Sequence, residues 1–424
     1  MPTALQVHGP APLKGRVRVP GDKSISHRAL LLAALADGTS TISGLSEGED
    51  VAHTRDAVEA LGARVDRPGG AGTIAVTGGA LRAPERTVDV GNSGTGLRLL
   101  MGLAAGIAGT TRFDGDESIR RRPMDRVAVP LRSMGATVEG TGGTCRAPLA
   151  VTGGALRGID YALPVASAQV KGAVLLAGLA AEGETVVREV QITRAHTEEM
   201  LAAFGADVAV ATGEVRLRPG RLTASDVVVP GDPSQAAFWL VAASVVPGSD
   251  VTVEGIYLGP ARNGFLDVLA RMGADLEVDR ATGDVRARHA PLHGTDVTPD
   301  EIPGLVDEVP ALAVAAAVAD GPTRFLGAGE LRVKESDRIA TVVSELGALG
   351  ARVEPLADGL VIAGGGRFRA GHVDSHGDHR IAMAAAIAAL AAEGATEIGH
   401  WDVVATSYPG FEQDLESVRG WTAP

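Results

Sequence analysis

The segment Pro20-Gly-Asp-Lys-Ser-Ile-Ser-His-Arg places two cations and a hydroxyl at the predicted start of an apolar helix. Lys23 and Ser24 fall at its N-terminus, and Arg28 lies one turn beyond Ser24. Unpaired backbone N–H groups and the helix dipole favour anions at such a position, and the two side-chain charges add to that effect. The segment is therefore predicted to bind an anion.

A nucleotide-binding P-loop is the nearest alternative for this segment, but its spacing does not fit. The stretch from Gly15 to Gly21 is one residue too long, and Asp22 separates the glycine from the lysine. A second stretch, Gly91-Asn-Ser-Gly-Thr-Gly, misses the spacing of both the dinucleotide fingerprint and the serine-nucleophile elbow. We expect the backbone to approach a ligand closely there, with Arg98 on the helix that follows.

Two further stretches carry groups that suit a phosphate or a polyol. Ser167, Ala168 and Gln169 open another apolar run with a hydroxyl and an amide. Arg122 belongs to the run Arg120-Arg-Arg-Pro, which on its own is typical of a solvated basic loop. Because other candidate anion sites accompany it, we interpret Arg122 as an anion ligand.

Two adjacent carboxylates, Asp307 and Glu308, precede the apolar run Val309-Pro-Ala-Leu-Ala-Val-Ala-Ala-Ala-Val. As helix caps they would only stabilise that helix. A cap needs only one carboxylate, and either residue could serve as a general base in apolar surroundings.

The stretch Leu331-Arg-Val-Lys-Glu-Ser-Asp-Arg predicts Lys334, Glu335 and Arg338 within one helical turn. Lys334 and Arg338, at i and i+4, would share one face and repel each other. A shared anion would relieve that repulsion. The alternative is a surface turn with Asp337 as the partner of the cations.

Histidines and aspartates gather between His372 and His379. Their types would suit a metal, but no ordered ligand spacing is present and Arg380 would lie beside the cation. We favour a helix opening, Asp378-His-Arg, in which Arg380 pairs with a carboxylate, and expect no metal.

The elements that position these residues recur along the chain. Six helix openings lie 66 to 77 residues apart, beginning at Pro20, Gly91, Pro164, Pro230, Asp307 and Gly377. Amphipathic helices are predicted to stop at a glycine before a strand, at Gly62, Gly135, Gly205, Gly273 and Gly350. Two signatures with one period predict a helix-and-sheet module used six times, in two domains of three.

The composition narrows the class of protein. The chain has 424 residues, a net charge of −13, 45% hydrophobic residues and few aromatics, with 3 Trp, 3 Tyr and 7 Phe. Nucleic-acid binding is disfavoured because it needs a basic face and stacking aromatics. No apolar run reaches the ~18–20 residues of a membrane span, and no secretory segment is expected. A single cysteine, Cys145, fits a reducing, cytoplasmic compartment.

The chain is predicted to cross between its domains twice, at Val17-Arg-Val-Pro-Gly-Asp and at Val227-Val-Val-Pro-Gly-Asp. Residues 21–230 would form one domain, and residues 1–20 with 231–424 the other. The ligand would lie between them, where domain closure can exclude water.

Together the motifs resemble the enolpyruvyl transferases, and among them the EPSP synthase family. The matching segments stand in family order and are Pro20-Gly-Asp-Lys-Ser-Ile-Ser-His-Arg, Asn92-Ser-Gly-Thr-Gly-Leu-Arg, Arg122-Pro-Met, Ser167-Ala-Gln-Val-Lys, Leu331-Arg-Val-Lys-Glu-Ser-Asp-Arg and Asp378-His-Arg-Ile-Ala-Met. The resemblance implies an α/β (α+β) fold of two inside-out barrel domains, each with three βαβαββ repeats, and an active site in the interdomain cleft. It also implies transfer of the enolpyruvyl group of phosphoenolpyruvate to the 5-hydroxyl of shikimate-3-phosphate through a tetrahedral intermediate, without a cofactor.

The resemblance also assigns roles by position. The ligands of shikimate-3-phosphate would be Lys23, Ser24, Arg28, Ser167, Ala168 through its backbone, Gln169, Thr193, Asp307 and Lys334. The ligands of phosphoenolpyruvate would be Lys23, Gly94, Arg122, Gln169, Arg338 and Arg380. Asp307 would accept the 5-hydroxyl proton, Lys334 and Glu335 would handle protonation of the methylene, and Lys23 would assist catalysis. A monomer with these two substrates as its partners, inhibited by glyphosate in the phosphoenolpyruvate pocket, is expected.

Several positions depart from the family pattern. Thr406 stands where some members have a cation, His196 where some have a tyrosine, and Ala168 where others have a serine. Glu308 follows one subgroup, and Glu330 stands where others have an amide.

Two alternative functions stay open. A UDP-N-acetylglucosamine enolpyruvyl transferase would need a cysteine near residues 115–123, and none is there. A non-catalytic anion-binding protein would have no use for Asp307, whose charge would repel a polyanion.

Overall fold

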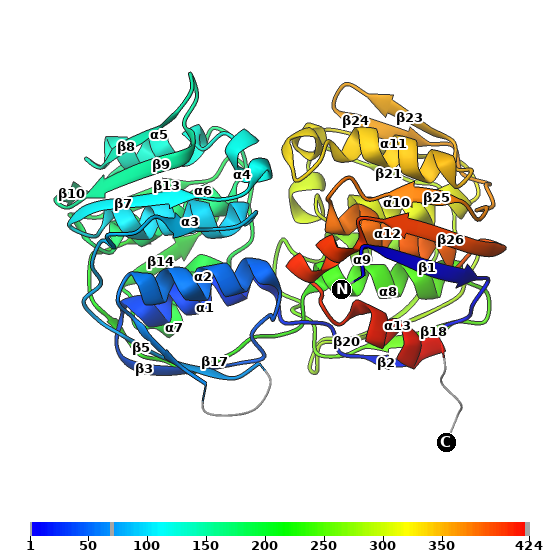
Figure 1. Cartoon of the computed structure of the whole chain (residues 1–424), viewed down its shortest axis with the longest axis horizontal. Coiled ribbons are helices and arrows are strands. Elements are labelled where there is room, and N and C mark those ends of the chain that lie inside the picture. The colour runs from blue at the N-terminus through cyan, green and yellow to red at the C-terminus, as the bar shows by residue number, and fades with distance from the viewer. Residues whose placement is uncertain (1, 68–71, 420–424) are drawn as a thin grey trace. The chain divides into compact units, whose positions relative to one another are not determined.

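The computed structural model describes residues 2–67 and 72–419 as a mixed α/β protein. The chain divides into two compact units, one of Lys23–Val229 and the other of Met1–Asp22 with Pro230–Pro424 (Figure 1). Each unit is built from modules in which a helix leads into a small sheet.

The module of residues 88–153 shows the pattern. Its elements are β6 (Val88–Asp89), α3 (Gly94–Ala105), β7 (Gly109–Asp114), α4 (Glu117–Arg121), α5 (Asp125–Ser133), β8 (Thr137–Thr141) and β9 (Arg146–Gly153). The sheet order is β6-β7-β9-β8. β6 runs parallel to β7, while β9 pairs antiparallel with β7 and with β8.

The same order recurs in the two other modules of this unit. One contains β11 (Asp160–Ala162), α6 (Ala168–Gly178), β13 (Thr185–Arg188), α7 (His196–Ala203), β14 (Val208–Ala211) and β15 (Glu214–Leu217). The other contains α1 (Lys23–Leu35), β3 (Ala36–Ser43), α2 (Glu49–Ala60), β4 (Arg64–Asp66), β5 (Ile74–Gly78) and β17 (Val227–Val228). Two short strands, β10 (Leu156–Arg157) and β12 (Ala181–Glu182), pair with each other. A third, β16 (Leu222–Thr223), pairs with β3.

The second unit repeats the order twice. One module contains β2 (Lys14–Val17), α8 (Pro233–Val245), β18 (Asp250–Val253), α9 (Gly264–Arg271), β19 (Asp275–Asp279) and β20 (Asp284–Arg288). The next contains β21 (Asp296–Val297), η1 (Ile302–Gly304), α10 (Val309–Val318), β22 (Thr323–Phe325), η2 (Gly329–Val333), α11 (Arg338–Ala348), β23 (Val353–Leu356) and β24 (Gly359–Ile362).

The sixth module is completed by the N-terminal strand. Its elements are β25 (His372–Asp374), α12 (His379–Ala389), β26 (Gly394–Gly399), η3 (Trp401–Thr406), α13 (Phe411–Arg419) and β1 (Ala4–Gly9). β1 pairs antiparallel with β26 and takes the place that a hairpin strand has in the other five modules.

The strand that precedes the first helix of each unit along the chain belongs to the sheet of the other unit. β2 directly precedes α1 along the chain but pairs with β18, whereas β17 directly precedes α8 but pairs with β3. The chain therefore changes unit twice, once after β2 and once after β17.

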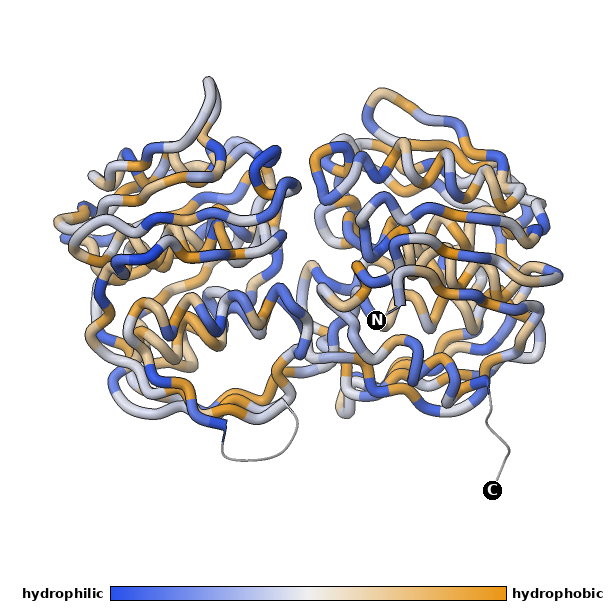
Figure 2. Tube along the Cα trace, in the orientation of Figure 1, coloured by the Kyte–Doolittle hydropathy of each residue, from blue (hydrophilic) through white to orange (hydrophobic). Residues whose placement is uncertain are grey.

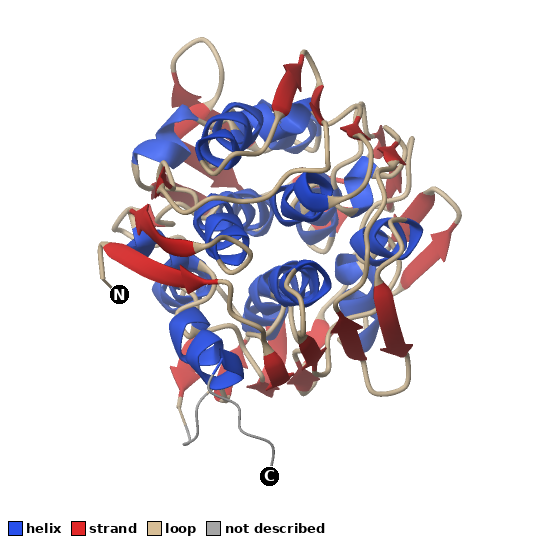
Figure 3. Ribbon diagram, turned by 90° about the vertical axis from the view of Figure 1, so that its right-hand side faces the viewer, coloured by secondary structure: helices blue, strands red, loops and turns tan. Residues whose placement is uncertain are grey.

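The helices that open the modules form the core. In α8 all thirteen residues are buried, and the sheets lie outside the helices, as the end-on view in Figure 3 shows. Hydrophobic residues run along these central helices (Figure 2). Small residues allow close packing: a Cβ on Gly102 would lie 2.2 Å from the carbonyl oxygen of Ala173, so only glycine fits where α3 meets α6.

The predicted starts of the core helices and the predicted stop glycines are confirmed. The six core helices begin at the expected openings, and each predicted stop glycine has a positive φ, as with Gly62 and Gly135 at +108°. Such a φ favours glycine because it has no Cβ. Over residues 2–67 and 72–419, no helix is both long and apolar enough to span a bilayer.

Candidate functional site

Arg28 holds together three elements of the unit of residues 23–229. Its buried guanidinium donates to the carbonyl oxygen of Ser24 at 2.9 Å, to Thr197 Oγ1 at 2.7 Å and to the carbonyl oxygen of Ala168 at 3.4 Å. The starts of α1, α6 and α7 therefore lie beside one cation. Ser24 and Arg28, predicted from one motif, are brought together with Ala168, predicted from another.

Lys23 has an acidic partner that the sequence interpretation missed. Its Nζ lies 2.7 Å from Oδ2 of Asp50, in the first turn of α2, and both side chains are largely buried. From sequence alone Asp50 is an ordinary acidic residue at a helix start, so no local signal marked it.

His27, between these two cations, is fully buried and contacts two neighbouring helices. Its Nδ1 lies 2.8 Å from Thr54 Oγ1, and its Nε2 lies 3.4 Å from Ser93 Oγ. Burial lowers the pKa of His27 well below its usual value, and the charges of Lys23 and Arg28 lower it further. The imidazole is therefore neutral at physiological pH.

Gln169 lies at the junction of α3 and α6. It accepts a hydrogen bond from Arg98 Nη1 at 2.9 Å and donates to Thr95 Oγ1 at 2.8 Å. Ser167 caps α6, since its Oγ accepts from the backbone N–H of Val170 at 3.3 Å.

Gly94 lies against the guanidinium of Arg122. A Cβ on Gly94 would be 2.8 Å from Arg122 Cζ, which is closer than real Cβ atoms approach. The backbone of the glycine-rich stretch thus lies close to a buried cation, and its predicted approach to a ligand stays a prediction. The alternative of a solvated basic loop does not hold for Arg122, because its side chain is buried, and its role as an anion ligand stays a prediction.

Thr193 belongs to a buried ionic network. Its N–H donates to Glu189 Oε1 at 3.1 Å, and its hydroxyl donates to the same oxygen. Lys171 Nζ lies 3.1 Å from Glu189 Oε2 and 2.6 Å from Glu198 Oε1. The scarcity of lysine, with only four in the chain, does mark Lys171 in the sequence, but no local signal marks its partners Glu189 and Glu198.

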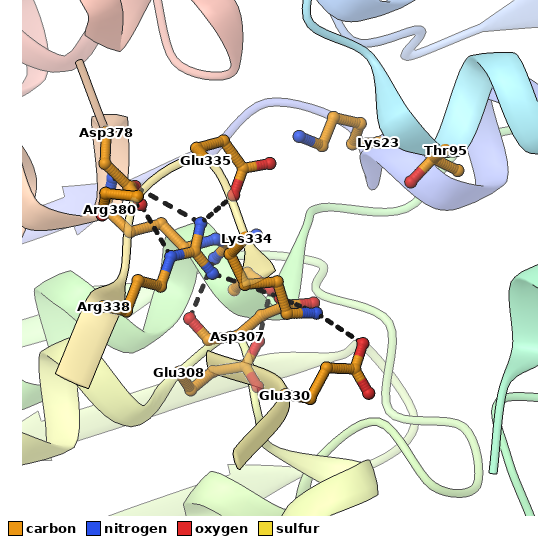
Figure 4. A network of polar contacts seen from close by, with 12 residues as sticks. Lys23, Thr95, Asp307, Glu308, Glu330, Lys334, Glu335, Arg338, Asp378 and Arg380 are labelled. Carbon is orange, nitrogen blue, oxygen red and sulfur yellow. Dashed lines mark hydrogen bonds and ion pairs between the residues drawn. The ribbon is translucent and has the colours of Figure 1, made fainter. Parts of the chain in front are cut away.

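In the other unit, Asp307 lies between two cations (Figure 4). Its Oδ1 is 3.5 Å from Arg338 Nη1 and 3.7 Å from Lys334 Nζ. Its carbonyl oxygen accepts a hydrogen bond from Arg380 Nη1 at 3.2 Å. Lys334 also pairs with Glu330 at 3.0 Å. The shared anion expected for Lys334 and Arg338 is a carboxylate of the protein itself.

Arg338 has two further carboxylate partners. Its Nη2 lies 2.6 Å from Glu335 Oε2, and its Nε lies 2.8 Å from Asp378 Oδ2. Burial opposes its charge, but Asp378 and Glu335 raise the pKa of Arg338 above its usual value.

The predicted helical turn containing Lys334 and Arg338 is wrong. η2 ends at Val333 and α11 begins at Arg338. Asp337 caps α11 by accepting from the N–H of Ala340 at 3.1 Å, so the preceding residues cannot continue the helix. Asp337 also pairs with Arg332 at 3.0 Å.

Glu308 does not cap α10 through its side chain. It is buried, accepts from Arg262 Nη1 at 2.8 Å and accepts a hydrogen bond from Ser234 Oγ. The capping alternative for Glu308 is therefore wrong. Arg262 was missed because a single arginine in the connection between β18 and α9 carries no local signal.

The histidine-rich stretch is dispersed in the structure. His376 Nε2 lies 2.9 Å from Glu345, whereas Asp378 caps α12 by accepting from the N–H of Arg380 at 2.9 Å. Within the described ranges no three residues among His, Cys, Asp and Glu are grouped to hold a metal. The predicted Asp378-His-Arg helix opening is confirmed.

The candidate site residues of the two units differ in the chemistry that they suit. One unit gathers cations, amides and hydroxyls at helix starts, which suits a phosphorylated polyol. The other holds a partly exposed carboxylate beside a lysine, which suits proton transfer.

Three kinds of comparison agree on the relatives of this chain. A family model described as EPSP synthase (3-phosphoshikimate 1-carboxyvinyltransferase) matches residues 7–415. The chain is 51% identical over 419 residues to the 3-phosphoshikimate 1-carboxyvinyltransferase of Gloeobacter violaceus, covering 96% of this chain and 97% of that one. It is 52% identical over 414 residues to the protein of that name from Halorhodospira halophila, covering 95% and 93%.

Solved structures give the same picture. EPSP synthase from Acinetobacter baumannii matches with a TM-score of 0.85 and 41% identity over 98% of each chain. The enolpyruvyl transferase NikO from Streptomyces tendae matches with a TM-score of 0.81 and 21% identity over 99% of each chain, which is a likeness of fold.

Proposed function

The chain belongs to the EPSP synthase family, and from that premise we propose how its own residues serve the reaction. It transfers the enolpyruvyl group of phosphoenolpyruvate to the 5-hydroxyl of shikimate-3-phosphate, giving EPSP and phosphate, in the shikimate pathway. The reaction is an addition followed by an elimination. Its chemical demands are the binding of two anions, removal of the hydroxyl proton and protonation of the methylene carbon.

Shikimate-3-phosphate is proposed to bind at the joined starts of α1, α6 and α7. The proposed ligands are Lys23, Ser24, Arg28, Ser167, Ala168, Gln169 and Thr193. The contacts of Arg28 with Ser24 and Ala168 support this set, because they hold the helix starts beside one positive charge.

Phosphoenolpyruvate is proposed to bind Lys23, Gly94, Arg122, Gln169, Arg338 and Arg380. Arg338 and Arg380 would pair with its carboxylate, for which a planar guanidinium is suited. The packing of Arg122 on Gly94 supports a second cationic group that the backbone can approach closely.

Asp307 is proposed as the base that accepts the 5-hydroxyl proton. Its carboxylate is partly exposed, unlike the buried Glu308, so a substrate can reach it. Lys334 and Glu335 are proposed to handle protonation at C3. Lys334 contacts Asp307 directly, whereas Glu335 contacts Arg338, which itself contacts Asp307.

The observation that carries this proposal is the position of Asp307 beside Lys334 and Arg338. A binding protein for polyanions gains nothing from such a carboxylate. We further propose that the enzyme acts as a cytoplasmic monomer, uses no metal or cofactor and binds glyphosate in the phosphoenolpyruvate pocket.

The rival enolpyruvyl transferase that uses UDP-N-acetylglucosamine is not favoured. Its cysteine would have to be Cys145, which is buried in the β8–β9 hairpin. Burial raises the pKa of that thiol above its usual value, which makes it a poor nucleophile.

Release of phosphate from phosphoenolpyruvate tests the proposal. We expect release with shikimate-3-phosphate and none without it. Release that depends on UDP-N-acetylglucosamine instead would overturn the assignment, and specific binding of both anions without turnover would favour the binding protein.

A further inference from the structure

A buried ionic cluster lies behind the Asp307–Glu308 turn, within the unit that contains residues 230–424. Arg262 is its centre and has three carboxylate partners. Its Nη2 lies 2.6 Å from Asp232 Oδ1 and 3.2 Å from Asp22 Oδ2, and its Nη1 lies 2.8 Å from Glu308 Oε1. All four side chains are at most 4% exposed. Such a cluster is stable only if the partners are held in place together.

Two of the carboxylates belong to the segments where the chain changes unit. Asp22 and Asp232 each end a Pro-Gly-Asp sequence, and the two segments pair with each other. The N–H of Asp22 donates to the carbonyl oxygen of Pro230 at 2.7 Å, and that of Asp232 donates to Pro20 at 2.9 Å. Arg262 thus binds both connecting segments through equivalent residues.

The backbone beside Arg262 is strained. Ala261 has a φ of +53°, in the left-handed region that residues with a Cβ rarely adopt. Such a conformation persists where surrounding contacts enforce it.

The third carboxylate joins the cluster to Asp307. Glu308 directs its side chain to Arg262 and Ser234, while Asp307, its neighbour in the chain, directs its side chain to Lys334 and Arg338. The contacts of Glu308 with Arg262 and Ser234 therefore fix the backbone of this turn, and with it the direction in which the side chain of Asp307 points.

We propose that Arg262 is a positioning residue for this reaction: through Glu308 it fixes the turn that presents Asp307 to the substrate hydroxyl. This inference rests on the proposed role of Asp307 as the base. It explains why two adjacent acids are present, since one accepts the proton and the other holds the turn.

Because charged groups surround Asp307, the pH dependence of kcat can separate a positioning role of Arg262 from a purely stabilising one. The cations that face it are Lys334, Arg338, Arg380 and Arg262, and the nearby carboxylates are Glu308, Glu330, Glu335 and Asp378. Removing the Glu308 charge lowers the pKa of a base at Asp307, because a negative neighbour disfavours a second negative charge. Removing the Arg262 charge raises it for the opposite reason.

The primary test is Glu308→Gln, because glutamine keeps the size and one acceptor oxygen while it removes the charge. We expect kcat to fall about tenfold or more with both KM values nearly unchanged, the pattern of an interaction needed in the transition state. The acidic limb of the kcat–pH profile should move to lower pH. Arg262→Met should move it to higher pH, and Arg262→Lys should restore part of kcat.

Two further variants keep the test decisive if Arg262→Met does not fold. Ser234→Ala removes one hydrogen bond to Glu308 and should lower kcat less than Glu308→Gln does. Tyr408→Phe serves as the control, because it removes the hydrogen bond that the Tyr408 hydroxyl accepts from Trp239 Nε1 and the one that it donates to Asp414. It should lower the melting temperature without changing the kcat–pH profile.

A Glu308→Gln enzyme with lowered melting temperature, but with kcat and pH profile like those of Tyr408→Phe, would overturn the inference. Asp307→Asn separates this failure from failure of the proposed function. If Asp307→Asn keeps its turnover, the base assignment is wrong and the inference falls with it. If only Asp307→Asn loses turnover, the base stands and the positioning role of Arg262 is refuted.

Discussion

Asp378 contacts both arginines that are proposed to bind the carboxylate of phosphoenolpyruvate. Its Oδ2 lies 2.8 Å from the Nε of Arg338, and its Oδ1 accepts from the backbone N–H of Arg380 at 2.9 Å. Burial alone would raise the pKa of Asp378, but the charge of Arg338 holds it below its usual range. One buried carboxylate therefore contacts two proposed ligands on different helices.

Asp378→Asn should separate these two contacts. Asparagine still caps α12, whereas the ion pair with Arg338 is lost, so the free energy of unfolding should fall by about 3 kcal/mol. Because the folded pKa of Asp378 is depressed, its contribution is full above the unfolded value of ~3.9 and is lost as the pH falls through the folded value. Urea unfolding should show a constant difference between wild type and variant from about pH 8 to pH 5 that shrinks below about pH 4.

The matched control is Asp374→Asn, which removes an exposed ion pair with His400. It should cost less than about 1 kcal/mol. If both variants lose the same stability, burial of the Arg338–Asp378 pair is not what makes it strong.

Asp307→Asn tests the proposed base. Turnover should fall by about 10²–10⁴, the usual effect of removing a general base, while shikimate-3-phosphate still binds. Glu330→Gln is the control, because it removes a different carboxylate from the same Lys334. Steady-state kinetics and calorimetry measure both effects. Turnover of Asp307→Asn within about threefold of wild type would be too small for a base.

Gly94→Ala should act through Arg122. The new methyl would lie 2.8 Å from the guanidinium, which is the flexible end of a side chain and can move away. The fold should therefore survive, but the added methyl should crowd the pocket and weaken the binding of glyphosate, the longer ligand, by about 1–3 kcal/mol, as overpacking does. Phosphoenolpyruvate, which is shorter, should lose less.

Inhibition measured against phosphoenolpyruvate compares wild type with the variant. Gly143→Ala is the control, since nothing lies within 4 Å of its added Cβ. A Gly94→Ala enzyme as sensitive as Gly143→Ala would show that this contact does not govern the pocket.

We expect the buried His27 to lower the free energy of unfolding in mild acid. Its pKa is lowered mainly by burial, so below the unfolded value of about 6.5 the unfolded chain takes up a proton that the folded one does not. The contribution of His27 to stability is therefore full above that value and is lost progressively as the pH falls below it. His27→Gln should remove that part of the slope in urea unfolding. Equal slopes for both proteins would mean that His27 is protonated in the folded state.

Much of the fold could be predicted because its signals are local. A glycine after an amphipathic helix, as at Gly62 and Gly350, has a positive φ whatever the rest of the chain does. The six helix openings and their period are of the same kind. The error at Lys334 and Arg338 arose because two cations at i and i+4 fit one helix, whereas Asp337 caps a helix that begins only at Arg338.

The sequence by itself therefore determined the modules, the helix starts and the cationic groups placed on them, since each depends on a few consecutive residues. Only the tertiary structure decided which charges meet. Lys23 with Asp50, Lys171 with Glu189, and Arg262 with Asp22 are separated in sequence by up to 240 residues. Their pairing depends on how the helices pack and on where the chain passes from one unit to the other, after β2 and after β17. No local sequence pattern encodes these pairings.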